Sequence, residues 1–189
     1  MLIDSDGYCV LIDLGFAKVV TEKTYTLCGT PLYLAPEIIL SRGYDKCVDN
    51  WSFGVLIFEM IYGYSPFYSP NIDQITLFKR IVRVQYSFPH MPSNVSHEAK
   101  DLISRILILN PARRLGSLAN GDADIRYHQW LAAFSPSMLI NKEVPAPWKP
   151  NVKSPTDASN FDDWSHLKDK QFMRHTALSK KEQELFKDF

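Results

Sequence analysis

This sequence has no excess of either charge and no long apolar segment. Its 21 lysines and arginines equal its 21 aspartates and glutamates, so no net positive field favours a nucleic acid or an anionic membrane surface. The longest apolar run, around residues 55–58, is interrupted by Glu59 and is much shorter than the ~20 residues of a membrane-spanning helix. We therefore expect no nucleic-acid partner and no membrane span.

Cysteine is also scarce, and the three cysteines are widely separated: Cys9, Cys28 and Cys47. An odd number with no Cys-x-x-Cys pair argues against both a disulfide framework and a zinc site. The first residues lack the basic and apolar segments of a secretory signal, so we expect a location in the cytoplasm or the nucleus. None of the five histidines shows metal-ligand spacing, and we expect them at the surface.

What the sequence does contain suits one globular domain with a core, because 46% of its 189 residues are apolar and 22% are charged. Residues 2–3 and 8–12 are β-prone runs on either side of a polar turn that ends at Gly7, which predicts a hairpin. Asp13 would then lie at the end of the second strand. Residues 15–36 show no sustained periodicity and predict a long, functional loop.

The rest of the chain predicts helices and then a tail. Residues 48–62 are apolar nearly all round and end at Gly63, which predicts a buried helix. Amphipathic patterns predict surface helices at 72–84 and at 96–109, where Ser96 can cap the first turn, and a short helix is expected at 123–131. Frequent prolines from Pro145 onward predict an extended tail, with a short helix-compatible stretch at 180–185.

Three short motifs occur in a fixed order: Asp13-Leu14-Gly15, Ala35-Pro36-Glu37 and Asp49-x-Trp51-Ser52-x-Gly54. A fourth, Gly29-Thr30-Pro31-x-Tyr33, lies between the first two. Each is weak by itself, because such tripeptides arise by chance. In this order they resemble the carboxy-terminal lobe of a eukaryotic protein kinase.

Longer runs narrow the resemblance to the cyclic-nucleotide-dependent kinases of the AGC group; they are Gly15-Phe16-Ala17-Lys18, residues 24–31 and residues 159–164. The end, Phe186-Lys187-Asp188-Phe189, is similar to the cAMP-dependent branch, whereas Ser154-Pro155-Thr156-Asp157 is similar to the cGMP-dependent branch. Both branches stay open. The resemblance implies a mainly α, kinase-like lobe with a small β-hairpin at residues 1–134, and an AGC-type tail at residues 135–189.

The resemblance also implies a role for the first motif in binding ATP and Mg²⁺. Phosphoryl transfer needs its negative charge neutralised, and Asp13 matches the carboxylate that holds the metal and the nucleotide. The alternative is a solvated turn aspartate. Thr30 resembles the residue that hydrogen-bonds the catalytic groups and helps to select Ser or Thr acceptors.

Thr26 matches the activation-loop threonine of this family, and Lys18 matches one of the cations that pair with its phosphate. A phosphate there adds nearly two negative charges and three strong hydrogen-bond acceptors. The resemblance therefore implies phosphorylation at Thr26. The alternative is an ordinary loop threonine and a solvated lysine.

Substrate recognition is implied for Glu59, which matches the glutamate that receives a substrate Arg two residues before the acceptor. A carboxylate in so apolar a helix requires some partner, and the alternative is an internal salt bridge. Leu27, Pro31 and Leu34 match the apolar pocket for the residue after the acceptor, although Leu27 or Leu34 could be simple core. Leu32 departs from the usual Glu, which puts preference for a distal substrate Arg in doubt.

Three further residues are implied to be structural. Glu37 and Arg114 resemble an ion pair that ties the activation segment to the lower helices, and breaking a buried pair of this kind costs ~3–5 kcal/mol. Asp49 resembles the residue that accepts backbone N–H groups from the catalytic loop.

In the tail, Phe161 and Trp164 flank two aspartates and look like the segment that closes over the adenosine of ATP; the alternative is simple docking of the tail. Phe186 and Phe189 would insert into a groove of the amino-terminal lobe.

Two hypotheses about function follow. Met1 aligns just after the asparagine of the catalytic loop, so the sequence contains no Gly-rich loop, no phosphate-binding Lys and no His-Arg-Asp loop. The first hypothesis is a fragment of a kinase that phosphorylates Ser or Thr near Arg in protein substrates, with these residues inactive by themselves. The second is a non-catalytic module that binds an inhibitory segment or a cyclic-nucleotide-binding regulatory subunit or domain through Glu59 and the Leu27, Pro31 and Leu34 surface.

Overall fold

The computed structural model describes residues 1–154, 156–163 and 183–184. Helices dominate it, and strands β1 (Leu2–Ile3) and β2 (Cys9–Val10) pair antiparallel, with Leu2 opposite Val10. The predicted fold class, mainly α with a small hairpin, is therefore confirmed. The structure has two compact units: Ile12–Pro145, and Met1–Leu11 with the described residues from Ala146 onward.

The hairpin turn is built around Asp4, whose Oδ1 accepts hydrogen bonds from the backbone N–H groups of Asp6 (3.0 Å) and Tyr8 (2.9 Å). Gly7 follows with φ +88°, and a Cβ there would lie 2.3 Å from the carbonyl oxygen of Trp148. Only glycine fits between the turn and this part of the tail. The strand predicted at 8–12 ends at Val10, because β1 supplies only two paired residues.

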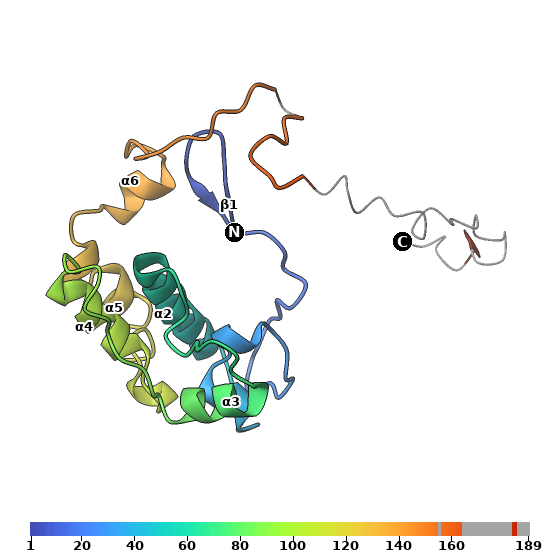
Figure 1. The fold of residues 1–189 in the computed structure, drawn as a ribbon, viewed down its shortest axis with the longest axis vertical. Helices are drawn as coiled ribbons and strands as arrows, with labels where there is room; N and C mark the ends of the chain where they lie inside the picture. The colour runs from blue at the N-terminus through green and yellow to red at the C-terminus, as the bar shows by residue number, and fades with distance from the viewer. Residues whose placement is uncertain (155, 164–182, 185–189) are drawn as a thin grey trace. The chain divides into compact units, whose positions relative to one another are not determined.

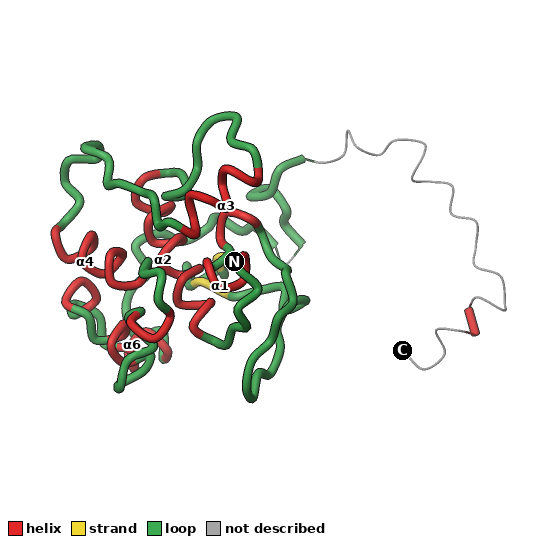
Figure 2. Tube along the Cα trace, turned by 90° about the horizontal axis from the view of Figure 1, so that it is seen from below, coloured by secondary structure: helices red, strands yellow, loops and turns green. Residues whose placement is uncertain are grey.

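In the larger unit, helix α2 (Cys47–Tyr62) contacts α4 (His97–Ile106) and the 3₁₀ helix η1 (Pro31–Tyr33). Figures 1 and 2 show α4 beside α2. Helix α1 (Pro36–Ile39) packs against α3 (Gln74–Val82), which also contacts η1. The remaining elements are η2 (Pro111–Arg113), α5 (Ala123–Arg126), η3 (Gln129–Leu131) and α6 (Pro136–Ile140). The candidate site is thus built on α2 and on the loops before it.

Helix α2 forms where the long apolar window predicts a helix, and it ends at Gly63, whose φ of 81° closes it in a left-handed cap. Trp51, Val55 and Phe58 on this helix are almost completely buried. Burial on all sides was a wrong prediction, however, because Phe53 is 36% exposed. Met60 lies seven residues further along the same face and is 65% exposed.

The amphipathic helices are shorter than predicted. Helix α3 begins at Gln74, because the Asp73 side chain accepts from the N–H of Thr76 at 3.0 Å and caps the first turn. The predicted cap of α4 is confirmed, since Ser96 accepts from the N–H of Ala99 at 3.2 Å. The helix predicted at 123–131 divides into α5 and η3, because His128 between them has extended backbone angles.

The core of this unit is one cluster of buried apolar side chains, which joins α2 to α1, α3 and α4: Leu34, Ala35, Ile38, Trp51, Val55, Ile57, Phe58, Tyr62, Phe67, Leu77, Ile81, Leu102, Ile103, Ile106, Leu107, Leu115 and Ile125. Within the described part of the chain, no helix combines the length and the apolar character that crossing a bilayer requires.

Candidate functional site

The Asp13-Leu14-Gly15 motif forms a tight turn. Asp13 has φ +62°, a left-handed conformation that aspartate tolerates better than most residues. Its Oδ1 accepts from the N–H of Gly15 at 3.2 Å. Asp13 was predicted to lie at the end of the second strand. That prediction is wrong, because β2 ends at Val10 and Asp13 lies in the loop beyond it.

An exposed carboxylate such as Asp13 fits magnesium, which proteins bind through one or two carboxylates together with substrate phosphates and water. Among residues 1–154, 156–163 and 183–184, no group of three or more His, Cys, Asp or Glu side chains has the geometry to hold a metal. A metal held by Asp13 would therefore need ligands from outside these residues.

Thr26 is exposed on the loop that follows, and its backbone carbonyl accepts a hydrogen bond from the hydroxyl of Tyr44 at 2.7 Å. Lys18 does not reach Thr26 in this structure. Its Nζ donates to the hydroxyl of Thr24, two residues earlier, at 3.3 Å. Lys18 is therefore near the implied phosphosite without contacting it.

Thr30 is exposed and directly precedes η1, where its carbonyl accepts from the N–H of Tyr33 at 2.9 Å. The implied substrate pocket is not uniform in exposure. Leu27 is 60% exposed and Pro31 is half-buried, whereas Leu34 is only 5% exposed and belongs to the core. The structure therefore favours the alternative for Leu34, a core residue.

Glu59 on α2 is half-buried, and its Oε2 accepts a hydrogen bond from the hydroxyl of Tyr33 at 2.5 Å. Burial, then this hydrogen bond and the negative charge of Glu59, raise the pKa of Tyr33 to about 12. Among the described residues the partner of Glu59 is a phenol and not a cation, so no internal salt bridge is found there. On the same helix, the hydroxyl of Ser52 donates to the carbonyl of Tyr33 at 3.0 Å, so α2 fixes Tyr33 at two points.

Sequence reasoning missed Tyr33 as the partner of this carboxylate, although the residue belongs to the Gly29-Thr30-Pro31-x-Tyr33 motif. Its position in that motif was the available signal. Tyr33 and Glu59 are 26 positions apart in the sequence. Only the folded chain could therefore identify them as partners.

Glu37 and Arg114 come together as an ion pair. The guanidinium Nη1 and Nη2 atoms lie 2.8 and 3.0 Å from the two carboxylate oxygens. Nη1 also donates to the carbonyl of Cys47 at 2.7 Å, and the guanidinium carbon lies 5.2 Å from the ring centroid of Trp51. The second motif is thus joined to the first turn of α2 through Arg114.

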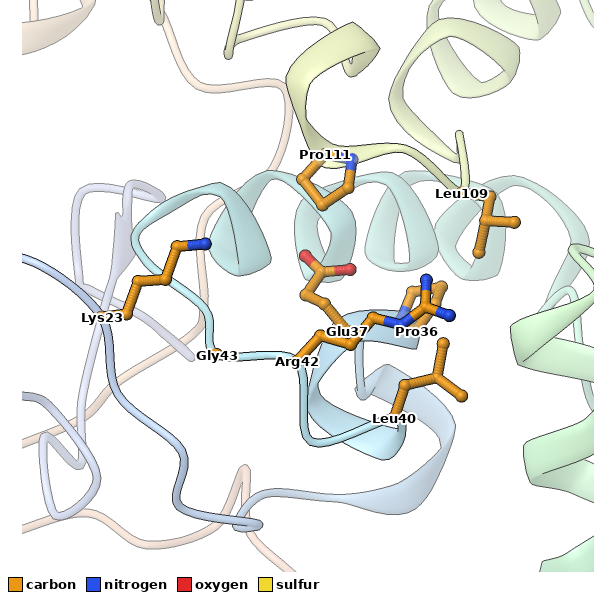
Figure 3. A pocket seen from close by; sticks show the side chains of 8 residues that line it. All are labelled: Lys23, Pro36, Glu37, Leu40, Arg42, Gly43, Leu109 and Pro111. Carbon is orange, nitrogen blue, oxygen red and sulfur yellow. The ribbon is translucent and has the colours of Figure 1, made fainter.

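A pocket of about 270 Å³ lies beside this ion pair. Figure 3 shows its lining: Lys23, Pro36, Glu37, Leu40, Arg42, Gly43, Leu109 and Pro111. Arg114 neutralises the charge of Glu37. The remaining charged residues of the lining, Lys23 and Arg42, give the pocket a net positive charge. The pocket borders both the activation loop and the segment that follows α1.

Asp49 lies in the first turn of α2. Burial of the carboxyl group raises its pKa, because a charged carboxylate loses hydration when neighbouring protein covers it. Asp49 is nevertheless exposed, so solvent weakens the effect of this partial covering on stability, and the carboxylate is accessible from outside the described residues.

His128 is a correction to the prediction of surface histidines, since its side chain is only 8% exposed. Its Nδ1 accepts from the N–H of Trp130 at 3.2 Å, and its Nε2 lies 3.0 Å from Oδ2 of Asp101. The hydrogen bond with His128, and then the positive charge of Arg105, lower the pKa of Asp101. This contact joins α4 to η3.

In the tail, the carboxylate of Asp157 organises a turn by accepting from the N–H groups of Lys153 (2.8 Å) and Ser159 (2.9 Å). Phe161 follows and is 61% exposed. The predictions for Trp164, Phe186 and Phe189 lie outside the described residues, as does most of the helix predicted at 180–185.

Comparison with protein families gives two matches. Residues 1–131 match the protein kinase domain, and residues 152–189 match the protein kinase C terminal domain. The first match contains all of the ordered motifs, and the second begins within the proline-rich tail.

Individual relatives agree with these matches. The chain is 42% identical over 162 residues to the cAMP-dependent protein kinase catalytic subunit of Dictyostelium discoideum, which covers 86% of the chain and 24% of that protein. It is 35% identical over all 189 residues to the human cAMP-dependent protein kinase catalytic subunit PRKX, of which it covers 51%. It is 40% identical over 164 residues to mouse cGMP-dependent protein kinase 2, with 86% and 21% covered. The chain thus spans about half of the length of one of these relatives and about a quarter or less of the other two.

Proposed function

This chain belongs to the protein kinase family, among the cyclic-nucleotide-dependent serine/threonine kinases of the AGC group, and we propose that the complete protein phosphorylates Ser or Thr near Arg in protein substrates. The match of residues 1–131 to the kinase domain carries this proposal. The geometry supports it, because the Glu37–Arg114 pair joins the activation segment to the lower helices, as the resemblance implies.

Kinases use ATP and Mg²⁺, and here we propose Asp13 as the metal ligand. Bound Mg-ATP would supply the phosphoryl group and a cation that neutralises its charge. Asp13 would hold that cation, Thr30 would contact the catalytic groups, and Phe161 would cover the adenosine. The division into a lobe at 1–134 and a tail at 135–189 is part of the same proposal.

Substrate selection is proposed to depend on Glu59. The Tyr33 hydroxyl donates to one oxygen of this carboxylate and fixes its orientation, and the other oxygen is available to accept from a substrate guanidinium. Leu27 and Pro31 at the surface would contact the residue after the acceptor. Leu34, 5% exposed, would support that surface from the core.

Three further roles complete the proposal. Thr26 becomes phosphorylated, and Lys18 pairs with the phosphate. Lys18 already donates a hydrogen bond to Thr24, two residues before Thr26. The Asp49 carboxylate accepts hydrogen bonds from backbone N–H groups of the catalytic loop in the complete protein and so orients that loop. A cyclic-nucleotide-binding regulatory subunit or domain is the proposed regulator, and the cytoplasm or the nucleus is the proposed location.

The decisive experiment measures phosphate transfer by the complete protein that contains this chain. With Mg-ATP and a Ser peptide that carries Arg two residues before the acceptor, we expect transfer, and Asp13→Asn should lower it at least ~100-fold. The 189 residues by themselves should transfer none, because they contain no Gly-rich loop and no His-Arg-Asp loop. No transfer by the complete protein would end the proposal.

Two measurements test the individual roles. Glu59→Ala should lower kcat/KM about 10- to 100-fold for the Arg peptide, since a charge-assisted hydrogen bond contributes ~1.5–3 kcal/mol, and should leave a matched Ala peptide unaffected. Equal losses for both peptides would remove the assignment. Phosphopeptide mapping of active protein should find phosphate on Thr26; active protein with Thr26 unmodified would contradict that site.

A further inference from the structure

Two segments of the larger unit that are distant in the sequence are joined beside the proposed phosphosite. Residues 24–26 of the activation loop run along Gly43 and Tyr44, which follow α1. We call these five residues the loop clip. Nothing in the proposed phosphoryl-transfer chemistry requires this junction, so its role needs a separate explanation.

Three hydrogen bonds hold the loop clip together. The N–H of Thr24 donates to the carbonyl of Tyr44 at 2.9 Å, and the N–H of Tyr44 donates to the carbonyl of Thr24 at 2.9 Å. The Tyr44 hydroxyl then donates to the carbonyl of Thr26 at 2.7 Å. Thr24 is only 7% exposed, so the first two bonds are shielded from water, whereas the Thr26 side chain stays exposed.

The shape of the loop clip depends on glycine. Gly43 has φ +70°, and a Cβ at this residue would lie 2.8 and 2.9 Å from two ring carbons of Tyr25 and 3.0 Å from its hydroxyl oxygen. Both the backbone conformation and the close approach of the ring therefore exclude other residues without strain. The ring of Tyr25 covers the backbone at this point.

The segment that carries Gly43 and Tyr44 is itself anchored. Before it, the N–H of Arg42 donates to the carbonyl of Glu37 at 3.0 Å. After it, the carbonyl of Cys47 accepts from Arg114, the partner of Glu37. Figure 3 shows Gly43 and Arg42 on one backbone segment beside Glu37. The loop clip is thus fixed to the buried ion pair at both ends.

The Tyr44 hydroxyl keeps its proton at neutral pH. Burial, followed by the effect of the neighbouring Cys28 thiol, raises the pKa of Tyr44 above its ordinary value of 10.0. The phenol is therefore a permanent donor to Thr26.

We propose that Tyr44 is a positioning residue, whose hydroxyl and backbone hold the activation loop in its ordered path before Thr26 carries a phosphate. Only the part of this inference that concerns phosphorylation rests on the proposed function; the ordering itself does not. A phosphate on Thr26 then further stabilises an activation loop that is already ordered. Residues 43 and 44 fix the backbone of the loop at residues 24–26.

The test is hydrogen exchange of the full, unphosphorylated 189-residue chain, compared with Tyr44→Phe. Loss of one hydrogen bond predicts about five-fold faster exchange of the amides of Thr24 and Tyr44, the two backbone donors of the loop clip, with α2 amides unchanged. The matched control is Tyr127→Phe, which removes a hydroxyl from a ring that is 70% exposed. Equal exchange in the wild type and Tyr44→Phe would overturn the proposal.

A second readout separates local positioning from general destabilisation. Trypsin should cleave Tyr44→Phe faster than the wild type after Lys23, next to the loop clip, and equally fast after Lys79 in α3. Gly43→Ala should shift cleavage in the same direction. Faster cleavage at both sites would show that Tyr44 is only structural. Neither readout involves phosphate transfer, so an inactive complete protein would end the proposed function and leave this result unaffected.

Discussion

Arg114 and Glu37 meet in a bidentate ion pair whose side chains are 0% and 6% exposed. Arg114 also binds the carbonyls of Cys47 and Ile108. One buried cation therefore joins the segment after the activation loop, the start of α2 and the chain after α4. Such a group stabilises the fold only while all of its partners are present.

Replacing Arg114 by Met should lower the free energy of unfolding by ~3–5 kcal/mol, because the Glu37 carboxylate is left buried without its partner. Urea unfolding of the chain measures this loss. Arg105 is the matched control: it pairs with Asp101, but its side chain is 59% exposed, and Arg105→Met should cost only about 0–1 kcal/mol. Similar losses for the two variants would contradict the structural role of the buried pair.

The pair of Tyr33 and Glu59 predicts a specific response to alkaline pH. The pKa of Tyr33 is raised to about 12 in the folded chain, above its ordinary value of 10.0. The folded state therefore binds this proton more tightly, and its contribution to stability is present below pH 10 and is lost between about pH 10 and 12.

Urea unfolding at pH 9 and at pH 11 measures this effect. The free energy of unfolding should fall less between the two pH values for Tyr33→Phe than for the wild type. Glu59→Gln should reduce the loss as well, because it removes the negative charge that raises the pKa. Tyr127→Phe should behave like the wild type. An undiminished loss in Tyr33→Phe would show that the tyrosine is not coupled to Glu59.

Asp49 should oppose stability at neutral pH. Burial raises its pKa in the folded chain, so the folded state holds the proton more tightly and loses stability as pH rises through the range between the unfolded and folded pKa values. Asp49→Asn should therefore raise the urea midpoint of the 189-residue chain slightly at pH 7, because the residue is exposed and solvent screens most of the effect. At pH 3, where both states are mostly protonated, the difference should disappear. In the complete protein the same change should lower kcat.

Asp101 should behave in the opposite way. Its pKa is lowered by the hydrogen bond with His128 and by Arg105, so its contribution to stability is present above the unfolded pKa and is lost as pH falls through the folded one. Asp101→Asn should lower stability at pH 7 and have a much smaller effect near pH 3. The exposed Asp122→Asn serves as a control; its side chain is 59% exposed and lies 4.0 Å from Lys46. An effect of Asp101→Asn that is equal at both pH values would contradict the contact with His128.

Local patterns predicted the elements that depend on nearby residues. The helix at 47–62 follows from an apolar window that ends at a glycine, and the start of α4 follows from the short-range cap by Ser96. Boundaries were less accurate, because the ends of α3 and of β2 depend on side-chain caps and on the length of the paired strand. The ordered motifs indicated the family before any geometry was known.

The sequence by itself determined the family and the helical class, because motif order and hydrophobic periodicity are properties of the chain. Only the tertiary structure decided which groups meet: Tyr33 with Glu59, Tyr44 with Thr26, and His128 with Asp101. These partners are 18 to 27 residues apart, and no local propensity specifies a contact at that separation. Tertiary packing brings them together, and the polar groups that it buries must find hydrogen-bond partners there.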